Sequence, residues 1–406
     1  MTTLPKILVA VGTRPEAIKL GPVIKALKES GDIQTLVVTT GQHNDMLQRI
    51  LKVFDITPDI DLGIMEHQQS LNQIISRITM KMDVAIADLA PDIFLVQGDT
   101  SSAFASALVA YYCKIPVFHV EAGLRTHNLY SPYPEEGNRK LISTITSVHL
   151  APTLTAKKNL LTEGIPEDTI YVTGNPVIDA IKKMEKFASV NIKRFINDLS
   201  EGNNKIILVT SHRRESWGQP LRNICDAINE ISSLRSDVEF VFPLHMNPRV
   251  RATVKSILEP NRRVHLLEPL DYPDTLYTLK NSTLTMTDSG GIQEEATYYN
   301  VPLVILRDHT ERPEIIYQNR GVLAGRNRKR IVEEVMKILD TEKRFRCFDM
   351  PNPFGDGHAS RRIRLAIERF SRGVAPLLEA EEQFSSPDFS RRTGKTETNM
   401  KLKLNL

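Results

Sequence analysis

The chain alternates short apolar runs, rich in β-branched residues, with longer segments whose apolar residues recur every three or four positions. In the first half, such runs span residues 6–11, 35–40, 92–97 and 116–120. Between the second and third runs a long helix is predicted from the spacing of Leu71, Ile74, Ile75, Ile78, Met82 and Ile86. Strands that alternate with helices predict a parallel sheet that is covered on both faces.

The same pattern begins again after a break near residues 173–176. A charged, weakly apolar helical stretch covers residues 182–204, and new apolar runs span residues 205–210, 238–243, 264–267, 284–287 and 302–306. The simplest interpretation is two doubly wound, Rossmann-like α/β domains in tandem.

The predicted domains are an N-terminal one over residues 1–173 and a C-terminal one over residues 174–357. Residues 358–373 are expected to form a helix that packs back on the N-terminal domain. Residues 374–406 are rich in Ser, Thr, Lys and Glu without a sustained period. This last composition predicts a flexible tail.

Length, charge and cysteine content limit the classes of function that the protein can have. A chain of 406 residues is long enough for two cores, and a formal net charge of +3 gives no global signal for nucleic acid or an anionic membrane. The sequence shows neither a signal peptide nor an apolar run that could cross a bilayer, so a cytoplasmic protein is expected. The spacing of Cys113, Cys225 and Cys347 indicates neither a disulfide framework nor a metal site. Without a Gly-x-Gly-x-x-Gly turn or a Walker loop, redox and kinase functions are not indicated.

In such sheets ligands bind beyond the carboxyl ends of the strands, so the residues there are the candidates. After residues 284–287, Ser289 can cap a helix while Gly290 and Gly291 let backbone N–H groups approach an anion such as pyrophosphate. The same turn is also a common tight connection. Arginines follow neighbouring strands and suit phosphate; they are Arg213, Arg214, Arg307 and Arg312. Glu294 or Glu295 can accept hydrogen bonds from ribose, or is simply an acid in a first helical turn.

Acidic residues follow the strands of the first half. Asp99 and Glu121 come just after apolar runs, where burial and neighbouring charges can tune a carboxyl pKa for proton transfer. Asp99 can instead cap the following helix, whereas Glu is a poor cap. Glu135 lies near a helix start, which is also a common structural position. His212 stands beside two arginines, as expected for a phosphate or leaving-group role, or is a buried histidine with its hydrogen bonds satisfied.

Together these motifs resemble the non-hydrolysing UDP-N-acetylglucosamine 2-epimerases of bacteria, from about residue 6 to about residue 370. The matching segments, in order, are residues 12–19 (GTRPEAIK), 97–100 (QGDT), 119–125 (HVEAGLR), 134–139 (PEEGNR), 212–215 (HRRE), 287–295 (TDSGGIQEE) and 310–314 (TERPE). The resemblance implies two domains facing across a cleft in the glycosyltransferase-B arrangement, a homodimer, and no cofactor. It also implies interconversion of UDP-N-acetylglucosamine and UDP-N-acetylmannosamine for surface or capsular polysaccharide synthesis.

The resemblance implies elimination of UDP to a 2-acetamidoglucal and its return with a proton on the other face of C2. By motif match the catalytic set is Asp99, Glu121, Glu135 and His212. The acids are expected to move protons and His212 to assist the departing phosphate, while the face that each acid serves stays open. The implied UDP-sugar contacts are Arg14, Lys19, Arg213, Ser289, Gly290, Gly291, Glu295 and Arg312.

Two departures from the family pattern bear on binding. Many relatives place an aromatic residue for uracil at the position of Thr275, where Tyr272 and Tyr277 are near in this chain. Relatives with a second, effector UDP-N-acetylglucosamine site resemble the chain at Gln42, Arg213 and His245, but their arginine before residue 71 corresponds to Gln68. An effector site is therefore a weaker expectation than catalysis.

Three alternatives remain open at this stage. A UDP-sugar glycosyltransferase of the same fold would need an acceptor groove but not the acids of the first half. A hydrolysing epimerase would let water capture the intermediate and release N-acetylmannosamine. A catalytically inactive nucleotide-sugar sensor would bind without turnover, and the intact acids argue against it.

Overall fold

The computed structural model describes residues 4–41, 44–66, 69–211, 213–341 and 350–385, and it confirms the predicted α/β class. Its first sheet is parallel and has the strand order β3-β2-β1-β4-β5-β6-β7. The strands are β1 (Lys6–Val11), β2 (Gln34–Thr39), β3 (Ile60–Asp61), β4 (Ile93–Gln97), β5 (Val117–Val120), β6 (Val148–Ala151) and β7 (Ile170–Val172).

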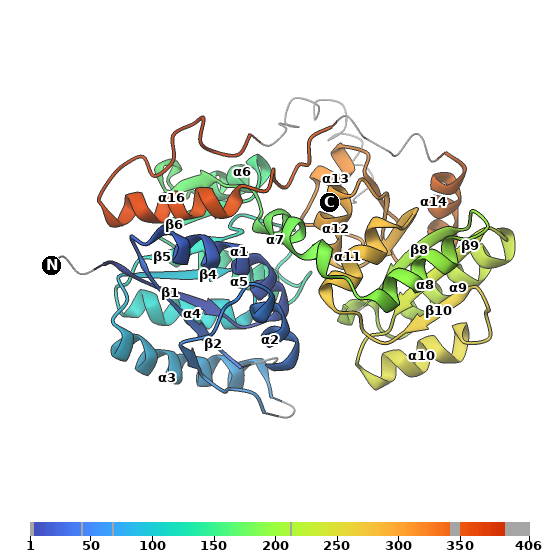
Figure 1. The fold of residues 1–406 in the computed structure, drawn as a ribbon, viewed down its shortest axis with the longest axis horizontal. Coiled ribbons are helices and arrows are strands. Elements are labelled where there is room, and N and C mark those ends of the chain that lie inside the picture. The colour runs from blue at the N-terminus through green and yellow to red at the C-terminus, as the bar shows by residue number, and fades with distance from the viewer. Residues whose placement is uncertain (1–3, 42–43, 67–68, 212, 342–349, 386–406) are drawn as a thin grey trace.

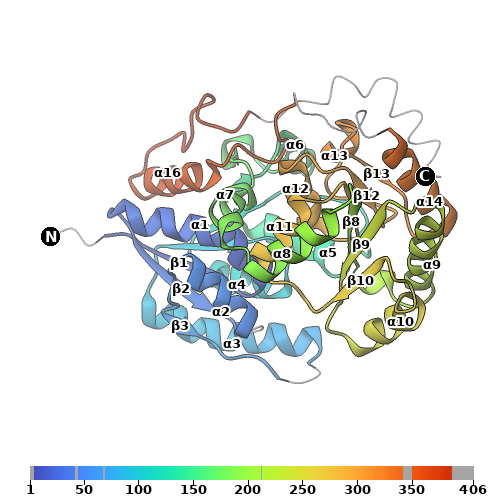
Figure 2. The ribbon, with the colours of Figure 1, turned by 45° about the vertical axis from the view of Figure 1, so that its right-hand side comes forward.

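Helices cover both faces of this sheet, as Figures 1 and 2 show. They are α1 (Arg14–Ser30), α2 (Asn44–Val53), α3 (Leu71–Leu89), α4 (Ser101–Tyr112), α5 (Glu135–Ile145) and α6 (Leu154–Thr162). Because side chains alternate along a strand, Ile7 and Val9 of β1 pack with α1 and α2, while Leu8 and Ala10 pack with α3 and α4. Such burial on both faces explains why the strands are continuous apolar runs.

The second sheet is also parallel, with the order β10-β9-β8-β11-β12-β13. Its strands are β8 (Lys205–Thr210), β9 (Val238–Pro243), β10 (Val264–Leu267), β11 (Leu284–Thr287), β12 (Leu303–Ile305) and β13 (Gly321–Leu323). The accompanying helices are α8 (Val190–Ser200), α9 (Gln219–Leu234), α10 (Pro248–Leu258), α11 (Tyr272–Lys280), α12 (Gly290–Tyr298), α13 (Glu314–Tyr317) and α14 (Arg328–Asp340). The structure thus contains two Rossmann-like units, side by side in Figure 1.

Helix α7 (Pro176–Met184) lies between the two units (Figure 1). It packs against α1 of the first unit and also touches α11 and α12 of the second. Helix α16 (Ala359–Ser371) packs on α1 and α7, and its Ile363 and Ile367 are buried in the core of the first unit. The carboxylate of Asp179 accepts hydrogen bonds from the first residues of α16 and so fixes its start.

The structure corrects the sequence-based prediction at two points. Four short strands, β3, β6, β7 and β13, were missed. The predicted flexible tail does not begin at Val374: Leu377 and Leu378 are buried, and the amide of Phe384 donates to the carbonyl of Val172 at 2.7 Å. Apolar burial therefore orders residues 374–385, and residues 386–406 lie outside the described part.

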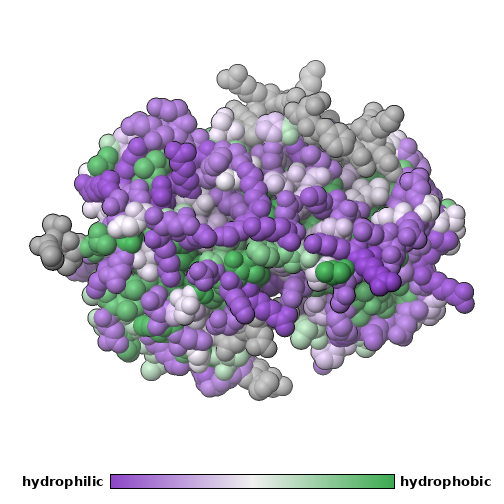
Figure 3. Space-filling view, in the orientation of Figure 1, coloured by the Kyte–Doolittle hydropathy of each residue, from purple (hydrophilic) through white to green (hydrophobic). Residues whose placement is uncertain are grey.

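The face of the molecule seen in Figure 3 is mostly hydrophilic, with apolar side chains gathered in small areas. Within the described residues, no helix is both long and apolar enough to span a membrane.

Candidate active site

Charged side chains from both units meet at the carboxyl ends of the two sheets. Lys19 of α1 pairs with Glu121, which follows β5, and its ammonium nitrogen lies 3.1 Å from Glu294 of α12. Arg312, which precedes α13, lies 2.6 Å from Glu294 and 3.7 Å from Glu121. These four side chains are almost fully buried. The structure therefore brings the predicted Lys19, Glu121 and Arg312 into one group across the two units.

Glu121 has an unusual backbone for a non-glycine residue, with φ of +68°. Such left-handed conformations cost free energy in L-residues and persist where the surroundings enforce them. Besides Lys19, its Oε2 atom accepts hydrogen bonds from Gln97 at 3.0 Å and Asn175 at 3.2 Å. Burial raises the pKa of Glu121, and the neighbouring Lys19 only partly offsets this. A carboxyl group held in this way suits proton transfer better than a surface acid.

Asp99 lies at the β4–α4 turn, about a fifth exposed, and pairs with Arg139 of α5 at 2.5 Å. Arg139 also lies 3.5 Å from Glu311 of the second unit. Burial opposes the ionisation of Glu311, but Arg307, Arg312 and Arg139 overcome it and hold its pKa well below the usual range. Asp99 is thus linked through Arg139 to an anionic partner across the interface. The helix that follows is capped by Thr100, not by Asp99, so the capping alternative for Asp99 is wrong.

Glu135 begins α5 and faces Arg213, with 3.4 Å between the guanidinium and Oε1. Its second oxygen is buried and makes no hydrogen bond within the described residues. Burial and the charge of Asp99 raise the pKa of Glu135, against the opposing effect of Arg213. Glu135 therefore combines an unused acceptor atom with a perturbed pKa, which is typical of a functional acid.

The turn Ser289-Gly290-Gly291 connects β11 to α12, and Ser289 caps the helix. A methyl group on Gly290 would lie 2.5 Å from the Arg312 guanidinium, whereas on Gly291 its nearest neighbour, Glu295, would be 3.8 Å away. The backbone thus approaches Arg312 closely at Gly290 and is more open at Gly291. A helix N-terminus beside a buried arginine favours an anion.

Glu295 lies one turn into α12 and is buried against Tyr272 of α11. Burial raises the pKa of Glu295 to about 7, although Tyr272 and Arg14 oppose the shift. One carboxylate oxygen of Glu295 has no hydrogen-bond partner within the described residues. Tyr272 is buried in the core of the first unit, whereas Thr275 donates its hydroxyl to the carbonyl of Asp271 at 3.0 Å.

Several residues that hold this site together were not predicted from the sequence. The Oδ2 atom of Asp288 accepts hydrogen bonds from Ser211 at 3.0 Å, the Arg213 amide at 3.1 Å and Ser216 at 2.8 Å. His119 hydrogen bonds to the carbonyl of Gly98 at 2.7 Å and, because of its burial, has a pKa lowered to about 3. Asp288 and His119 are polar residues beside or inside a buried strand, and this position is the sequence signal that could have identified them.

The predicted effector residues are only partly visible. Gln42 and Gln68, like the catalytic candidate His212, lie outside the described residues. His245 is partly exposed, its Nδ1 atom accepts a hydrogen bond from the amide of Asn247 at 3.1 Å, and its ring centroid lies 6.5 Å from that of Trp217. Burial lowers the pKa of His245. The described contacts of His245 therefore remain within the second unit.

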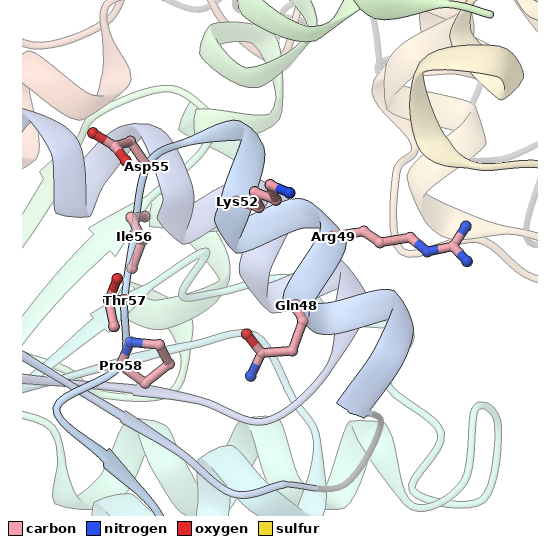
Figure 4. A pocket seen from close by; sticks show the side chains of 7 residues that line it. All are labelled: Gln48, Arg49, Lys52, Asp55, Ile56, Thr57 and Pro58. Atoms are coloured by element: carbon pink, nitrogen blue, oxygen red, sulfur yellow. The ribbon is translucent and has the colours of Figure 1, made fainter.

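No cluster of His, Cys, Asp and Glu in the described ranges could hold a metal ion. A separate surface pocket lies along α2 and the loop after it (Figure 4). Its lining residues are Gln48, Arg49, Lys52, Asp55, Ile56, Thr57 and Pro58. In Figure 4 the Arg49 side chain points away from the others, and it pairs with Asp271 at 2.9 Å. None of these residues belongs to the charged group described above.

Comparison with known proteins bears on what this site does. The profile of a family described as UDP-N-acetylglucosamine 2-epimerase matches residues 25–368. The chain is 43% identical to the UDP-N-acetylglucosamine 2-epimerase of Salmonella typhimurium over 371 residues, which cover 90% of this chain and 99% of that protein.

Solved structures agree with the sequence comparison. The UDP-GlcNAc 2-epimerase of Neisseria meningitidis, bound to UDP-GlcNAc, matches with a TM-score of 0.84 and 41% identity over 90% of this chain and 100% of that one. The enzyme of Methanocaldococcus jannaschii, in complex with UDP-GlcNAc and UDP, matches with a TM-score of 0.79 and 34% identity over 91% and 100%.

Proposed function

Since the chain belongs to the UDP-N-acetylglucosamine 2-epimerase family, we propose that it interconverts UDP-N-acetylglucosamine and UDP-N-acetylmannosamine without releasing free sugar. The observation that carries this proposal is the meeting of a buried acid of the first unit, Glu121, with Lys19 of the same unit and Arg312 of the second, beside the helix N-terminus at Ser289. The acids can move the C2 proton while the cations hold UDP.

The proposed reaction runs through elimination, because the hydrogen on C2 of the sugar is not acidic enough for simple deprotonation. A base takes the C2 proton as the bond from C1 to the phosphate oxygen breaks, which gives UDP and 2-acetamidoglucal. An acid then delivers a proton to the other face of C2, and the phosphate oxygen bonds to C1 again. The atoms and electrons of this reaction balance without an oxidant or a cofactor.

The raised pKa values of Glu121 and Glu135 support their assignment, with Asp99, as the proton-moving acids. His212, which lies outside the described residues, is proposed to assist the departing phosphate. For retention of UDP we propose Arg14, Lys19, Arg213, Ser289, Gly290, Gly291, Glu295 and Arg312. Close packing of the two units around this group would exclude water from the glycal.

We also propose that the protein acts as a homodimer whose product supplies surface polysaccharide synthesis. Helices α3, α4 and α5 lie side by side and carry exposed apolar side chains, namely Met80, Val84, Tyr111, Tyr112 and Leu141. Exposed apolar side chains that gather on neighbouring helices are typical of a protein contact, whereas scattered single ones are ordinary. A second UDP-N-acetylglucosamine as effector, near Gln42, Gln68 and His245, remains part of the proposal.

The deciding experiment incubates the protein with UDP-N-acetylglucosamine in D2O and follows the sugar by proton NMR. Deuterium at C2 together with UDP-N-acetylmannosamine is the expected result. Free N-acetylmannosamine would instead indicate a hydrolysing epimerase. No exchange at C2 would overturn epimerisation, and transfer of the sugar to an added acceptor would indicate a glycosyltransferase.

A further inference from the structure

Glu16 is a buried carboxylate that joins two loops at the carboxyl end of the first sheet. It is 2% exposed and lies in the first turn of α1. Its Oε2 atom accepts hydrogen bonds from the backbone amides of Gly12 and, at 3.2 Å, Thr13. Its Oε1 atom accepts a hydrogen bond from the hydroxyl of Thr100 at 2.6 Å. One carboxylate therefore connects the β1–α1 turn to the β4–α4 turn.

We propose that Glu16 is a positioning residue for Asp99. Glu16 fixes the turn that presents Asp99 and sets the charge beside it. The inference rests on the proposed epimerase function, in which Asp99 moves a proton. It assigns Glu16 a role in the reaction without direct contact with the substrate.

The geometry supports a positioning role because Thr100 directly follows Asp99. The Thr100 hydroxyl both donates to Glu16 and accepts from the Ala103 amide at 3.0 Å, so it locks the start of α4. On the other side of Asp99, its own carbonyl accepts a hydrogen bond from Asn138 at 2.9 Å. The Asp99 turn is therefore held from both sides, and Glu16 is the charged group on the α1 side.

Glu16 also fills the position where an anion would otherwise bind at the start of α1. A methyl group on Gly12 would lie 2.7 Å from Ser102 and 3.1 Å from the Glu16 carboxylate, so the turn is closed around this side chain. The amides that could cradle a phosphate already donate to Glu16. The carboxylate thus takes the place of a bound anion at this turn.

The charge of Glu16 can change without loss of this geometry. Burial and, to a lesser extent, the charge of Asp99 raise the pKa of Glu16 to about 7. The three hydrogen bonds that Glu16 accepts lower the pKa but do not cancel the effect of burial. Asp99 is the charged group that faces Glu16 from the β4–α4 turn, and α4 itself presents the uncharged Ser102. When Glu16 binds a proton, the Thr100 hydroxyl can accept the hydrogen bond that it otherwise donates. The proton therefore alters the electrostatic field at Asp99 and leaves the loops joined.

The test compares the full-length parent with E16Q, T100V and T100S. A glutamine at position 16 still accepts from the two amides but carries no charge. For each protein, kcat, KM and C2 exchange in D2O are measured from about pH 5.5 to about pH 8.5, across the range in which a shifted carboxyl titrates. The matched control is D179N, which changes a buried carboxyl of α7 that accepts hydrogen bonds from the first residues of α16.

We expect E16Q to lower kcat by roughly tenfold or more, with KM changed less than about twofold, and to alter the shape of the pH profile. T100V should lower kcat similarly, T100S should restore it, and D179N should leave the pH profile of the parent unchanged. The inference is wrong if the parent exchanges C2 but E16Q has the same kcat and pH profile. It is equally wrong if E16Q affects only KM or thermal stability. A parent that fails to exchange C2 at all would refute the proposed function itself.

Discussion

The ammonium nitrogen of Lys19 lies 3.1 Å from a carboxylate oxygen of Glu294, and this ion pair joins α1 of the first unit to α12 of the second. Lys19 also pairs with Glu121. Burial opposes the charge on Lys19, but Glu121 and Glu294 overcome it and raise the pKa of Lys19. Lys19 thus contacts two buried carboxylates that belong to different domains, one beside the proposed sugar site and one beside the proposed nucleotide site, and Arg312 contacts the same two.

Replacement of Lys19 by methionine should destabilise the protein. The variant removes one of the two cations, Lys19 and Arg312, that Glu121 and Glu294 share. Loss of one partner from a buried ion pair costs about 3–5 kcal/mol. Urea unfolding of K19M and the parent in the absence of ligand measures the difference. K25M changes a half-buried lysine on the same helix whose ion pair with Glu29 is a surface pair, so it should unfold like the parent. Equal stability of K19M and the parent would show that Lys19 does not compensate these carboxylates.

Replacement of Glu121 by glutamine should separate binding from chemistry. Glutamine keeps the size of the side chain and can still bond to Gln97 and Asn175, but it cannot take or give the C2 proton. We expect UDP binding within a few-fold of the parent by calorimetry and a loss of roughly 10²–10⁴ in C2 exchange, the range for a general acid or base. Exchange at the parental rate would remove Glu121 from the mechanism.

Much of the fold follows from the sequence because the longer strands are buried on both faces and appear as continuous apolar runs. Parallel topology then places the residues after each strand at one edge, which is why Asp99 and Glu121 can be identified as candidates from the sequence alone. The strand β7 escaped detection because its three residues stand alone, whereas the equally short β12 lies within the longer apolar run 302–306.

The hydrogen-bond and ion-pair partners of the site residues could not be predicted from the sequence. Arg139 meets Asp99 and Glu311, and Asp288 holds the loop that carries Arg213, through contacts between segments far apart in the chain. Glu16 completes a capping box with Thr13 at the start of α1. Its hydrogen bond to Thr100 spans 84 residues and depends on how α1 and α4 sit on the sheet.

The two glycines after Ser289 should differ in their tolerance of alanine. In G290A the new methyl group would meet the Arg312 guanidinium at 2.5 Å and Glu311 at 3.0 Å, so Arg312 must move. In G291A the nearest atoms are 3.8 Å and 3.9 Å away, which is ordinary contact. We expect G290A to lower the melting temperature and weaken UDP binding by about tenfold or more, the loss of one charge-assisted contact. G291A should melt like the parent, and equal melting temperatures for both variants would contradict the close approach at Gly290.

The stability of the ligand-free protein should depend on pH through Glu295. Burial raises the pKa of this carboxyl from its ordinary value of 4.5 to about 7 in the folded protein. Below about pH 4.5 both folded and unfolded forms carry the proton, so Glu295 adds no penalty. Between about pH 4.5 and about pH 7 the unfolded form releases its proton first, and the folded state loses stability. Above about pH 7 both forms are ionised and the loss stays constant.

The comparison of the parent with E295Q isolates this effect, because glutamine does not titrate. The free energy of unfolding of the parent, minus that of E295Q, should fall by on the order of 3 kcal/mol as the pH rises through this window. Urea unfolding at a series of pH values, without UDP, provides the measurement. E201Q, which changes an exposed glutamate after α8, should give a flat difference. A flat difference would mean that Glu295 ionises at the same pH in the folded and unfolded forms, and a rising one would mean that folding favours its ionisation. Either result would contradict a pKa that burial beside Tyr272 raises.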